Sequence, residues 1–159
     1  MSDPVSNLVI GLGNPLRGDD GVGWWLARRA RRCRPAPRVR LVPQLTPDLV
    51  LELAEARRVL FVDAWVRPST WDGEKPCLRP VLAAQALGVF SHGLSSGELL
   101  AVAELLAPDG PPLEAWELLI PAGGFGIGEG FSSRLQRQLP LGMELLRQWC
   151  DARIGEGLV

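Results

Sequence analysis

The stretch "LVIGLGNPLRGDDGVG", residues 8–23, decides the fold. Its apolar start belongs to a run from Asn7 to Gly11, which is short and closed by glycine, as expected of a buried parallel strand. Glycines and an asparagine follow, and then Asp19 and Asp20 stand where a helix should begin. A glycine-rich turn after a first strand commonly holds phosphate. Carboxylates repel phosphate, so we expect this turn to bind something else.

Apolar runs and helical patterns alternate along the rest of the chain. Further strands are predicted over residues 38–42, 58–64, 77–83 and 114–122. Helices are predicted over residues 21–33, 46–56, 95–106 and 140–150. Pro80 should confine its strand to an edge or a bulge. This alternation predicts one α/β domain over residues 1–159, folded as a three-layer sandwich.

The composition excludes several classes of protein. The 159 residues are 47% hydrophobic and 22% charged with a net charge of −1, which is ordinary for one globular domain and unlike a nucleic-acid binder. We find no signal peptide and no apolar run near the ~20 residues that cross a bilayer. Cys33, Cys77 and Cys150 are widely spaced, which argues against disulfides and a structural zinc site. We therefore expect a cytoplasmic protein with no membrane or nucleic-acid partner.

Three side chains with metal-binding chemistry follow separate predicted elements. Asp20 follows the first strand, Asp63 is placed at the end of strand 58–64, and His92 precedes the helix at 95–106. Ligands bind beyond the carboxyl ends of strands in open α/β sheets, so these residues are predicted to converge there. Two carboxylates and an imidazole suit a divalent ion such as nickel, zinc or cobalt, with coordination positions left open.

Each of these residues also has a plainer interpretation. Asp19 or Asp20 could cap the first helix and complement its dipole. Asp63 could accept hydrogen bonds from the amides of a neighbouring loop, and His92 could be structural. The metal hypothesis therefore depends on the position of these residues relative to the strand ends.

Two other motifs do not fit known sites. The dinucleotide pattern G-x-G-x-x-G fails because Leu16 stands at its third glycine. The sequence "GLSSG" at residues 93–97 matches a nucleophile elbow, but that site needs a histidine later in the chain and none follows His92. Ser95 is better explained as a helix N-cap that forms a capping box with Glu98.

The cysteines and arginines indicate structural roles. Cys33 is placed on the core face of the first helix, and Cys77 and Cys150 fall in regular elements rather than in an electropositive loop. The arginine-rich run at residues 28–34 lies at a helix C-terminus, where cations favour the dipole. We interpret it as a solvated face.

The segment "GLGNPLRGDDGVG" resembles the N-terminal signature of the hydrogenase maturation proteases, which process nickel–iron hydrogenases. Further family motifs are matched by Asp63 in "LFVDA", by His92 in "SHGLSSGELL" and by residues 118–133, "LLIPAGGFGIGEGFSS". The resemblance spans nearly the whole chain in the right order. The last segment is richer in glycine than the usual family form.

The resemblance implies an α/β/α sandwich with a mostly parallel five-stranded sheet. It also implies that Asp20, Asp63 and His92 bind the metal and are the catalytic residues of a metal-dependent endopeptidase. The substrate would be the nickel-loaded precursor of the hydrogenase large subunit, which loses a C-terminal extension. The nickel would be supplied by that precursor, and we expect the protease to be a monomer.

The chemistry of the residues agrees with a protease that activates water, since no plausible serine or cysteine nucleophile is present. Asp19, if it is not a cap, is a candidate base or support for the ligands. The glycines of residues 123–130 would let an extended substrate lie close to the backbone, or they form a mobile surface loop. Two alternatives stay open. One is a non-catalytic nickel-dependent maturation chaperone. The other is a peptidyl-tRNA hydrolase, a family that shares "GLGNP" but follows it with a tyrosine and a nearby histidine.

Overall fold

A five-stranded sheet forms the centre of the molecule. The computed structural model describes residues 6–66, 74–85 and 93–158. The strands are β1 (Asn7–Leu12), β2 (Arg38–Val42), β3 (Arg58–Val66), β4 (Cys77–Pro80) and β5 (Glu114–Ala122). Their order is β2-β1-β3-β5-β4, with β4 antiparallel to β5 and every other pair parallel. The predicted mostly parallel sheet is confirmed, and Pro80 lies on an edge strand as predicted.

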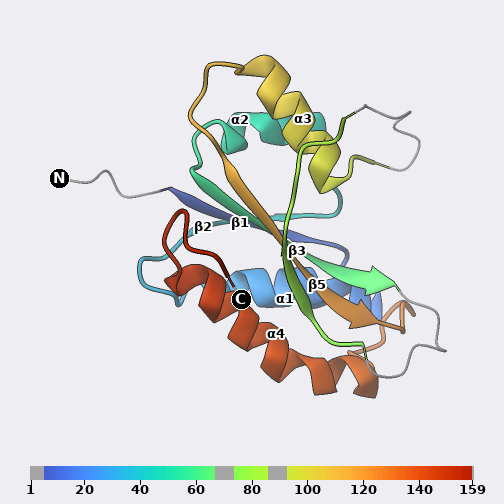
Figure 1. Ribbon diagram of the computed structural model, residues 1–159. Coiled ribbons are helices and arrows are strands. Elements are labelled where there is room, and N and C mark those ends of the chain that lie inside the picture. Colours follow the sequence, from blue (N-terminus) through green and yellow to red (C-terminus); the bar gives the residue numbers. More distant parts are fainter. Residues whose placement is uncertain (1–5, 67–73, 86–92, 159) are drawn as a thin grey trace.

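Helices cover both faces of this sheet. The α-helices are α1 (Val22–Ala30), α2 (Val50–Leu53), α3 (Ser96–Leu106) and α4 (Ser133–Asp151). Short 3-10 turns, η1 (Gly18–Gly21) and η2 (Pro47–Leu49), precede α1 and α2. Figure 1 shows α1 and α4 on one face and α2 and α3 on the other. The predicted three-layer sandwich is therefore confirmed.

Strands β1 and β3 send alternate side chains into two separate cores. Val9 and Leu60 pack with α1 and α4, whereas Leu8, Ile10 and Phe61 pack with α2 and α3. All five are at most 1% exposed. Because side chains of a strand alternate between its faces, a strand covered on both sides must be apolar at every position. This explains the uninterrupted apolar runs in the sequence.

Glycines at residues 11 and 23 allow α1 to lie directly on the sheet. A Cβ on Gly11 would stand 2.7 Å from the Cβ of Ala27. A Cβ on Gly23 would collide with the backbone carbonyl oxygens of Leu12 and Val62. The opening motif thus fixes the distance between α1 and strands β1 and β3, and with it the position of the loop between them.

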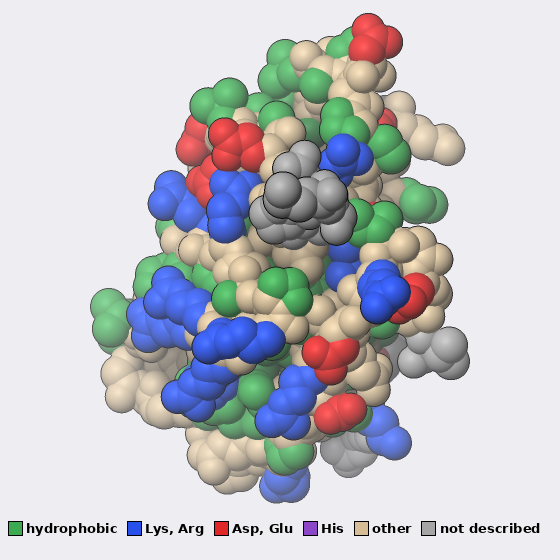
Figure 2. Space-filling model, turned by 90° about the vertical axis from the view of Figure 1, so that its left-hand side faces the viewer, with side chains coloured by type: hydrophobic (Ala, Val, Ile, Leu, Met, Phe, Trp, Pro, Cys, Tyr) green, Lys and Arg blue, Asp and Glu red, His purple; other side chains and the backbone are tan. Residues whose placement is uncertain are grey.

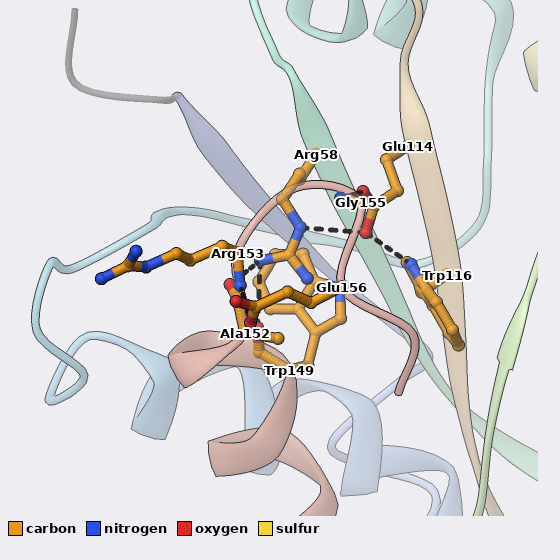
Figure 3. Close-up of polar contacts among 8 residues, drawn as sticks. All are labelled: Arg58, Glu114, Trp116, Trp149, Ala152, Arg153, Gly155 and Glu156. Atoms are coloured by element: carbon orange, nitrogen blue, oxygen red, sulfur yellow. Dashed lines mark hydrogen bonds and ion pairs between the residues drawn. The ribbon is translucent and has the colours of Figure 1, made fainter. Parts of the chain in front are cut away.

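A buried arginine ties the end of α4 to the sheet. Arg58, at the start of β3, is 1% exposed. Its Nε donates to Glu114 Oε1 at 3.2 Å, and its Nη1 donates to the carbonyl oxygens of Trp149 at 3.1 Å and Ala152 at 2.7 Å (Figure 3). Glu114 in turn accepts a hydrogen bond from the amide of Gly155 at 3.0 Å. Arg58 therefore satisfies carbonyls at the C-terminal end of α4, which lack partners within the helix.

Several predicted boundaries differ from the structure. The strand predicted over residues 77–83 ends at Pro80, and the helix predicted over residues 21–33 is α1, Val22–Ala30. Strand β3 continues to Val66, so Asp63 lies within the strand and not at its end. The helix predicted over residues 46–56 is a 3-10 turn followed by the four-residue α2. The amides of Glu55 and Ala56 then bond to the carbonyls three residues before them, which is a tighter turn than an α-helix. Residues 140–150 lie in the last helix, as predicted. That helix begins earlier, at Ser133, because the side chain of Ser132 accepts a hydrogen bond from the amide of Leu135 and caps it.

The arginine-rich run lies at the end of the molecule opposite the carboxyl ends of the strands. Arg31, Arg32 and Arg34 are exposed, and Arg29 lies 3.2 Å from the centroid of the Trp25 ring. Figure 2 shows Lys and Arg side chains spread over this side. The predicted solvated face is confirmed. No helix within the described ranges has the length and apolar character that spanning a membrane requires.

Candidate functional site

The turn after β1 is shaped to present Asp20. Gly13 has a φ of 117°, and a side chain there would collide with the backbone carbonyl of Asp20. The amide of Asn14 donates to Asp20 Oδ2 at 2.8 Å, and the side chain of Asn14 accepts from the amide of Leu16 at 2.9 Å. The turn therefore closes on the Asp20 carboxylate, which is half-buried.

Asp63 lies on the face of the sheet that α2 and α3 cover. It shares this face with Phe61, and its Oδ1 accepts a hydrogen bond from the amide of Ala64 at 2.8 Å. Burial raises the pKa of Asp63 to about 6; the Ala64 amide lowers it, and the negative charges of Asp20 and Glu117 raise it further. Asp20 is therefore near enough to Asp63 for its charge to act on that carboxylate, and Asp63 lies inside its strand.

His92 lies outside the described residues. The described chain resumes at Gly93, and a Cβ on Gly93 would stand 3.7 Å from the side-chain oxygen of Gln44. Gln44 follows β2, so the residue next to His92 is at the carboxyl edge of the sheet. Within the described ranges, no group of three or more His, Cys, Asp or Glu side chains could hold a metal ion. Asp20 and Asp63 are the two carboxylates that such a site would use.

Glu117 is a residue of this site that sequence reasoning missed. It stands two positions before Leu119, the partner of Asp63 in β5, and on the same face of the sheet. Glu117 accepts hydrogen bonds from Ser96 Oγ at 3.1 Å and from Arg79 Nε at 2.6 Å. The available signal was a carboxylate inside an otherwise apolar strand. Glu117 fixes the start of α3 beside Asp63.

The first helix is not capped by either aspartate, so that interpretation of Asp19 and Asp20 was wrong. The N-cap residue of α1 is Gly21, and no side chain caps it. Asp19 is completely buried and turns away from the helix. Its carboxylate accepts hydrogen bonds from the amides of Gly123 and Ser132, which lie in the segment that follows β5. Asp19 therefore joins two loops at the carboxyl edge of the sheet.

The remaining nucleophile candidates are structural. Ser95 and Glu98 form the predicted capping box of α3, with the Glu98 amide 3.2 Å from Ser95 Oγ and the Ser95 amide 2.8 Å from Glu98 Oε2. Cys33 is half-buried, and burial together with a hydrogen bond to Cys33 raises the pKa of the Cys150 thiol. A thiol with a raised pKa is a poor nucleophile. Ser95 and Cys150 therefore have structural roles in the part of the chain that the structure describes.

A cavity of about 720 Å³ lies elsewhere, between α2, α3 and the loop before β5. Its walls are mostly apolar and include Leu53, Leu100, Leu106 and Leu113, with Glu104 as an acidic residue. Glu104 is the one ionisable side chain among these lining residues, so the cavity lacks the several donor groups that a metal site needs. The Asp20–Asp63 pair is therefore the candidate functional site on chemical grounds.

The fold is shared with solved hydrogenase maturation proteases. The [NiFe] hydrogenase maturation protease HycI from Thermococcus kodakarensis KOD1 is 21% identical, with 94% of this chain and 93% of that chain covered and a TM-score of 0.64. A hydrogenase 2 maturation peptidase from Thaumarchaeota archaeon SCGC_AB-539-E09 is 17% identical, with 92% and 98% covered and a TM-score of 0.62. The hydrogenase maturating endopeptidase HybD from E. coli is 16% identical, with 87% and 88% covered and a TM-score of 0.59. No protein-family model and no curated protein matches the sequence. The chain thus has the fold of these proteases.

Proposed function

We propose that this protein is a hydrogenase maturation protease. It removes a C-terminal extension from the nickel-loaded precursor of a hydrogenase large subunit. Asp20, Asp63 and His92 complete the coordination of the metal that the precursor carries. The shared fold and the matching sequence motifs support this assignment together.

The observation that carries the proposal is the closeness of Asp20 and Asp63 at the carboxyl edge of the sheet. The pKa of Asp63 is raised to about 6, first by burial and further by the negative charges of Asp20 and Glu117. A divalent cation between two such groups would replace the repulsion with attraction. The pair therefore has the charge and the oxygen donors that a metal site needs.

The described neighbours of His92 support its part in the same site. Gly93 lies beside the loop that follows β2, and Ser96 is hydrogen-bonded to Glu117 on the face that carries Asp63. The ends of these connections meet at one edge of the sheet. We propose His92 as the third ligand because an imidazole completes a donor set suited to nickel.

A bound divalent metal polarises a peptide carbonyl and helps to activate water. The residues of this chain would hold the metal, orient the scissile peptide and accept a proton from the attacking water. The Asn14 amide keeps the Asp20 carboxylate oriented, and the Ala64 amide does the same for Asp63. Fixed ligands of this kind reduce the reorganisation that the reaction requires.

The direct test uses nickel-loaded and nickel-free precursor of a hydrogenase large subunit, incubated with the purified protein. Mass spectrometry should detect a short C-terminal peptide released from the loaded precursor alone. Intact precursor that stays bound to the protein would identify a non-catalytic maturation chaperone instead. If the protein neither cleaves nor binds either precursor, the proposal is refuted.

A further inference from the structure

We propose that Asp19 is a positioning residue for the reaction, an inference that rests on the proposed function. Its buried carboxylate holds the glycine loop, residues 123–132, against the turn that carries Asp20. The contact fixes the position of the glycine loop, which forms the side of the site where the precursor tail binds. The inference comes from four hydrogen bonds that converge on one side chain.

Both carboxylate oxygens of Asp19 are engaged by the glycine loop. Oδ2 accepts hydrogen bonds from the amides of Gly123 and Gly124, both at 3.0 Å, and from Ser132 Oγ at 2.7 Å. Oδ1 accepts one from the amide of Ser132 at 2.7 Å. Burial raises the pKa of Asp19, but these hydrogen bonds together lower it below the value of an ordinary aspartate. The loop is therefore built to receive an ionised carboxylate.

Backbone contacts join the same two segments. The amide of Asp19 donates to the carbonyl of Gly124 at 2.7 Å, and the amide of Gly128 donates to the carbonyl of Leu16 at 2.9 Å. Gly18, with a φ of 54°, lies so close that a Cβ would stand 2.6 Å from Gly124 O. The turn and the glycine loop thus form one unit. The backbone of the loop is held to the turn at Gly124 and at Gly128.

The contact between Asp19 and the glycine loop affects the site because Asp19 is next to Asp20 in the chain. Asp19 turns into the glycine loop, whereas Asp20 lies near Asp63. A shift in the backbone at residue 19 would move the Asp20 carboxylate as well. The amides of Gly123 and Gly124 point inward to Asp19, so the loop would meet substrate with its other groups.

Asparagine at residue 19 keeps the shape but breaks the contact. One end of the amide can accept hydrogen bonds as Oδ2 does, but the other end then presents hydrogen atoms to the amide of Ser132. Two donors facing each other in a buried site are unfavourable. Asp19→Asn should therefore loosen the glycine loop while leaving the two cores intact.

Hydrogen exchange tests the contact itself without reference to activity. In Asp19→Asn the amides of Gly123, Gly124 and Ser132 should exchange roughly tenfold faster or more, because their acceptor is weakened. The amide of Leu118, in the centre of β5, should be unchanged. The matched control is Asp109→Asn at an exposed position, which should change none of these rates. Wild-type exchange rates in the loop of Asp19→Asn would overturn the proposal.

Cleavage kinetics test the positioning role. With nickel-loaded precursor, at a temperature where the variant is folded, Asp19→Asn should raise KM roughly tenfold with a smaller change in kcat. If Asp19 only stabilised the fold, the folded variant would keep both wild-type values, and that result would refute positioning. Ser132→Ala removes one of the four bonds and should change KM in the same direction, so the test holds if Asp19→Asn fails to fold.

The two measurements separate this inference from the proposed function. If the wild-type protein does not cleave precursor, the proposed function and the substrate role of Asp19 both fail. The exchange rates still decide whether Asp19 holds the loop. If the wild-type protein cleaves and the variant is equally active with an open loop, the positioning role alone fails.

Discussion

At the scale of single residues, the ionisation of Asp63 links the site to stability. The pKa of Asp63 rises from the ordinary value of 3.8 to about 6, first because of burial. Between these values the native protein keeps a proton that the unfolded chain has lost. The free energy of unfolding should therefore fall as pH rises from about 4 to about 6 and stay level above that range.

Asp63→Asn should remove this dependence and stabilise the metal-free protein. At pH 7 we expect an increase of about 1–3 kcal/mol in the free energy of unfolding, because a shift of one pKa unit corresponds to ~1.4 kcal/mol. Urea denaturation at pH 4 and pH 7 with a chelator present would measure it. Equal effects at both pH values would show that the pKa of Asp63 is not raised in the folded protein. The variant should also lose precursor cleavage.

Arg58 offers a prediction at the opposite end of the sheet. Arg58→Met should lower the free energy of unfolding by about 3 kcal/mol, because it removes a buried charge that Glu114 pairs with and leaves helix carbonyls unsatisfied. The control is Arg38→Met, since Arg38 and Glu55 form an exposed ion pair worth less than about 1 kcal/mol. Chemical denaturation of both variants gives the comparison. A similar loss in the two would contradict a special role for Arg58.

The predictability of the site differs from residue to residue for a physical reason. The sequence predicts that Asp20 and Asp63 lie on one side of the sheet because the carboxyl ends of parallel strands share one edge, but it does not predict that β3 continues past Asp63 to Val66. Asp19 could not be placed, since its partners Gly123 and Ser132 are 104 and 113 residues away in sequence. Glu117 could not be placed either, since its neighbours on the adjacent strands are set by the register of the sheet. Such long-range contacts leave no local pattern.

At the scale of elements, the start of α3 connects stability with the site. Ser95 and Glu98 satisfy amides at its N-terminus. Ser96, which follows Ser95, donates a hydrogen bond from its hydroxyl to Glu117, beside Asp63. The helix end therefore depends on both local capping and a contact with the sheet.

Ser95→Ala should cost about 1 kcal/mol of stability, the usual effect of losing an N-cap. Thermal unfolding should show a Tm lower by a few degrees. Ser133→Ala, at the exposed first position of α4, is the matched control and should have little effect. Equal Tm values for Ser95→Ala and the wild type would mean that the capping box adds nothing to stability.

Helix boundaries show where local patterns fail. The apolar run over Glu114–Ala122 predicted β5 correctly, and the capping box predicted α3, because both signals are local. The start of α4 was missed, since Pro140 is typical of a first turn but lies inside the helix here. The first turn of α4 is held instead by the buried Leu135 and by the bond of Ser132 to Asp19.

At the scale of the whole molecule, the two ends of the sheet have different chemistry. The carboxyl edge carries Asp20, Asp63 and the glycine loop. At the amino edge, Arg58 is the first residue of β3, and the exposed arginines follow α1. Two large apolar side chains stand in solvent at the carboxyl edge: Leu16 is 69% exposed and Ile127 is 85% exposed. Their segments are joined by the bond between Gly128 and Leu16.

These two side chains should contact the precursor. Leu16→Ser and Ile127→Ser should each raise KM for the nickel-loaded precursor several-fold, because a large exposed side chain buried on binding contributes ~1–2 kcal/mol. Neither should change the free energy of unfolding by more than about 0.5 kcal/mol, since both side chains are exposed. Steady-state cleavage and urea denaturation of the same preparations measure the two effects.

Leu106→Ser provides the control, because Leu106 is 68% exposed but lies at the end of α3 beside the apolar cavity. It matches Leu16 in exposure and differs from it in place, so it should keep the wild-type KM. If Leu106→Ser raises KM as much as Leu16→Ser does, the precursor does not bind specifically at the carboxyl edge, and the prediction is wrong. If KM rises only for Leu16→Ser and Ile127→Ser, the edge of the sheet that carries Asp20 and Asp63 also binds the precursor.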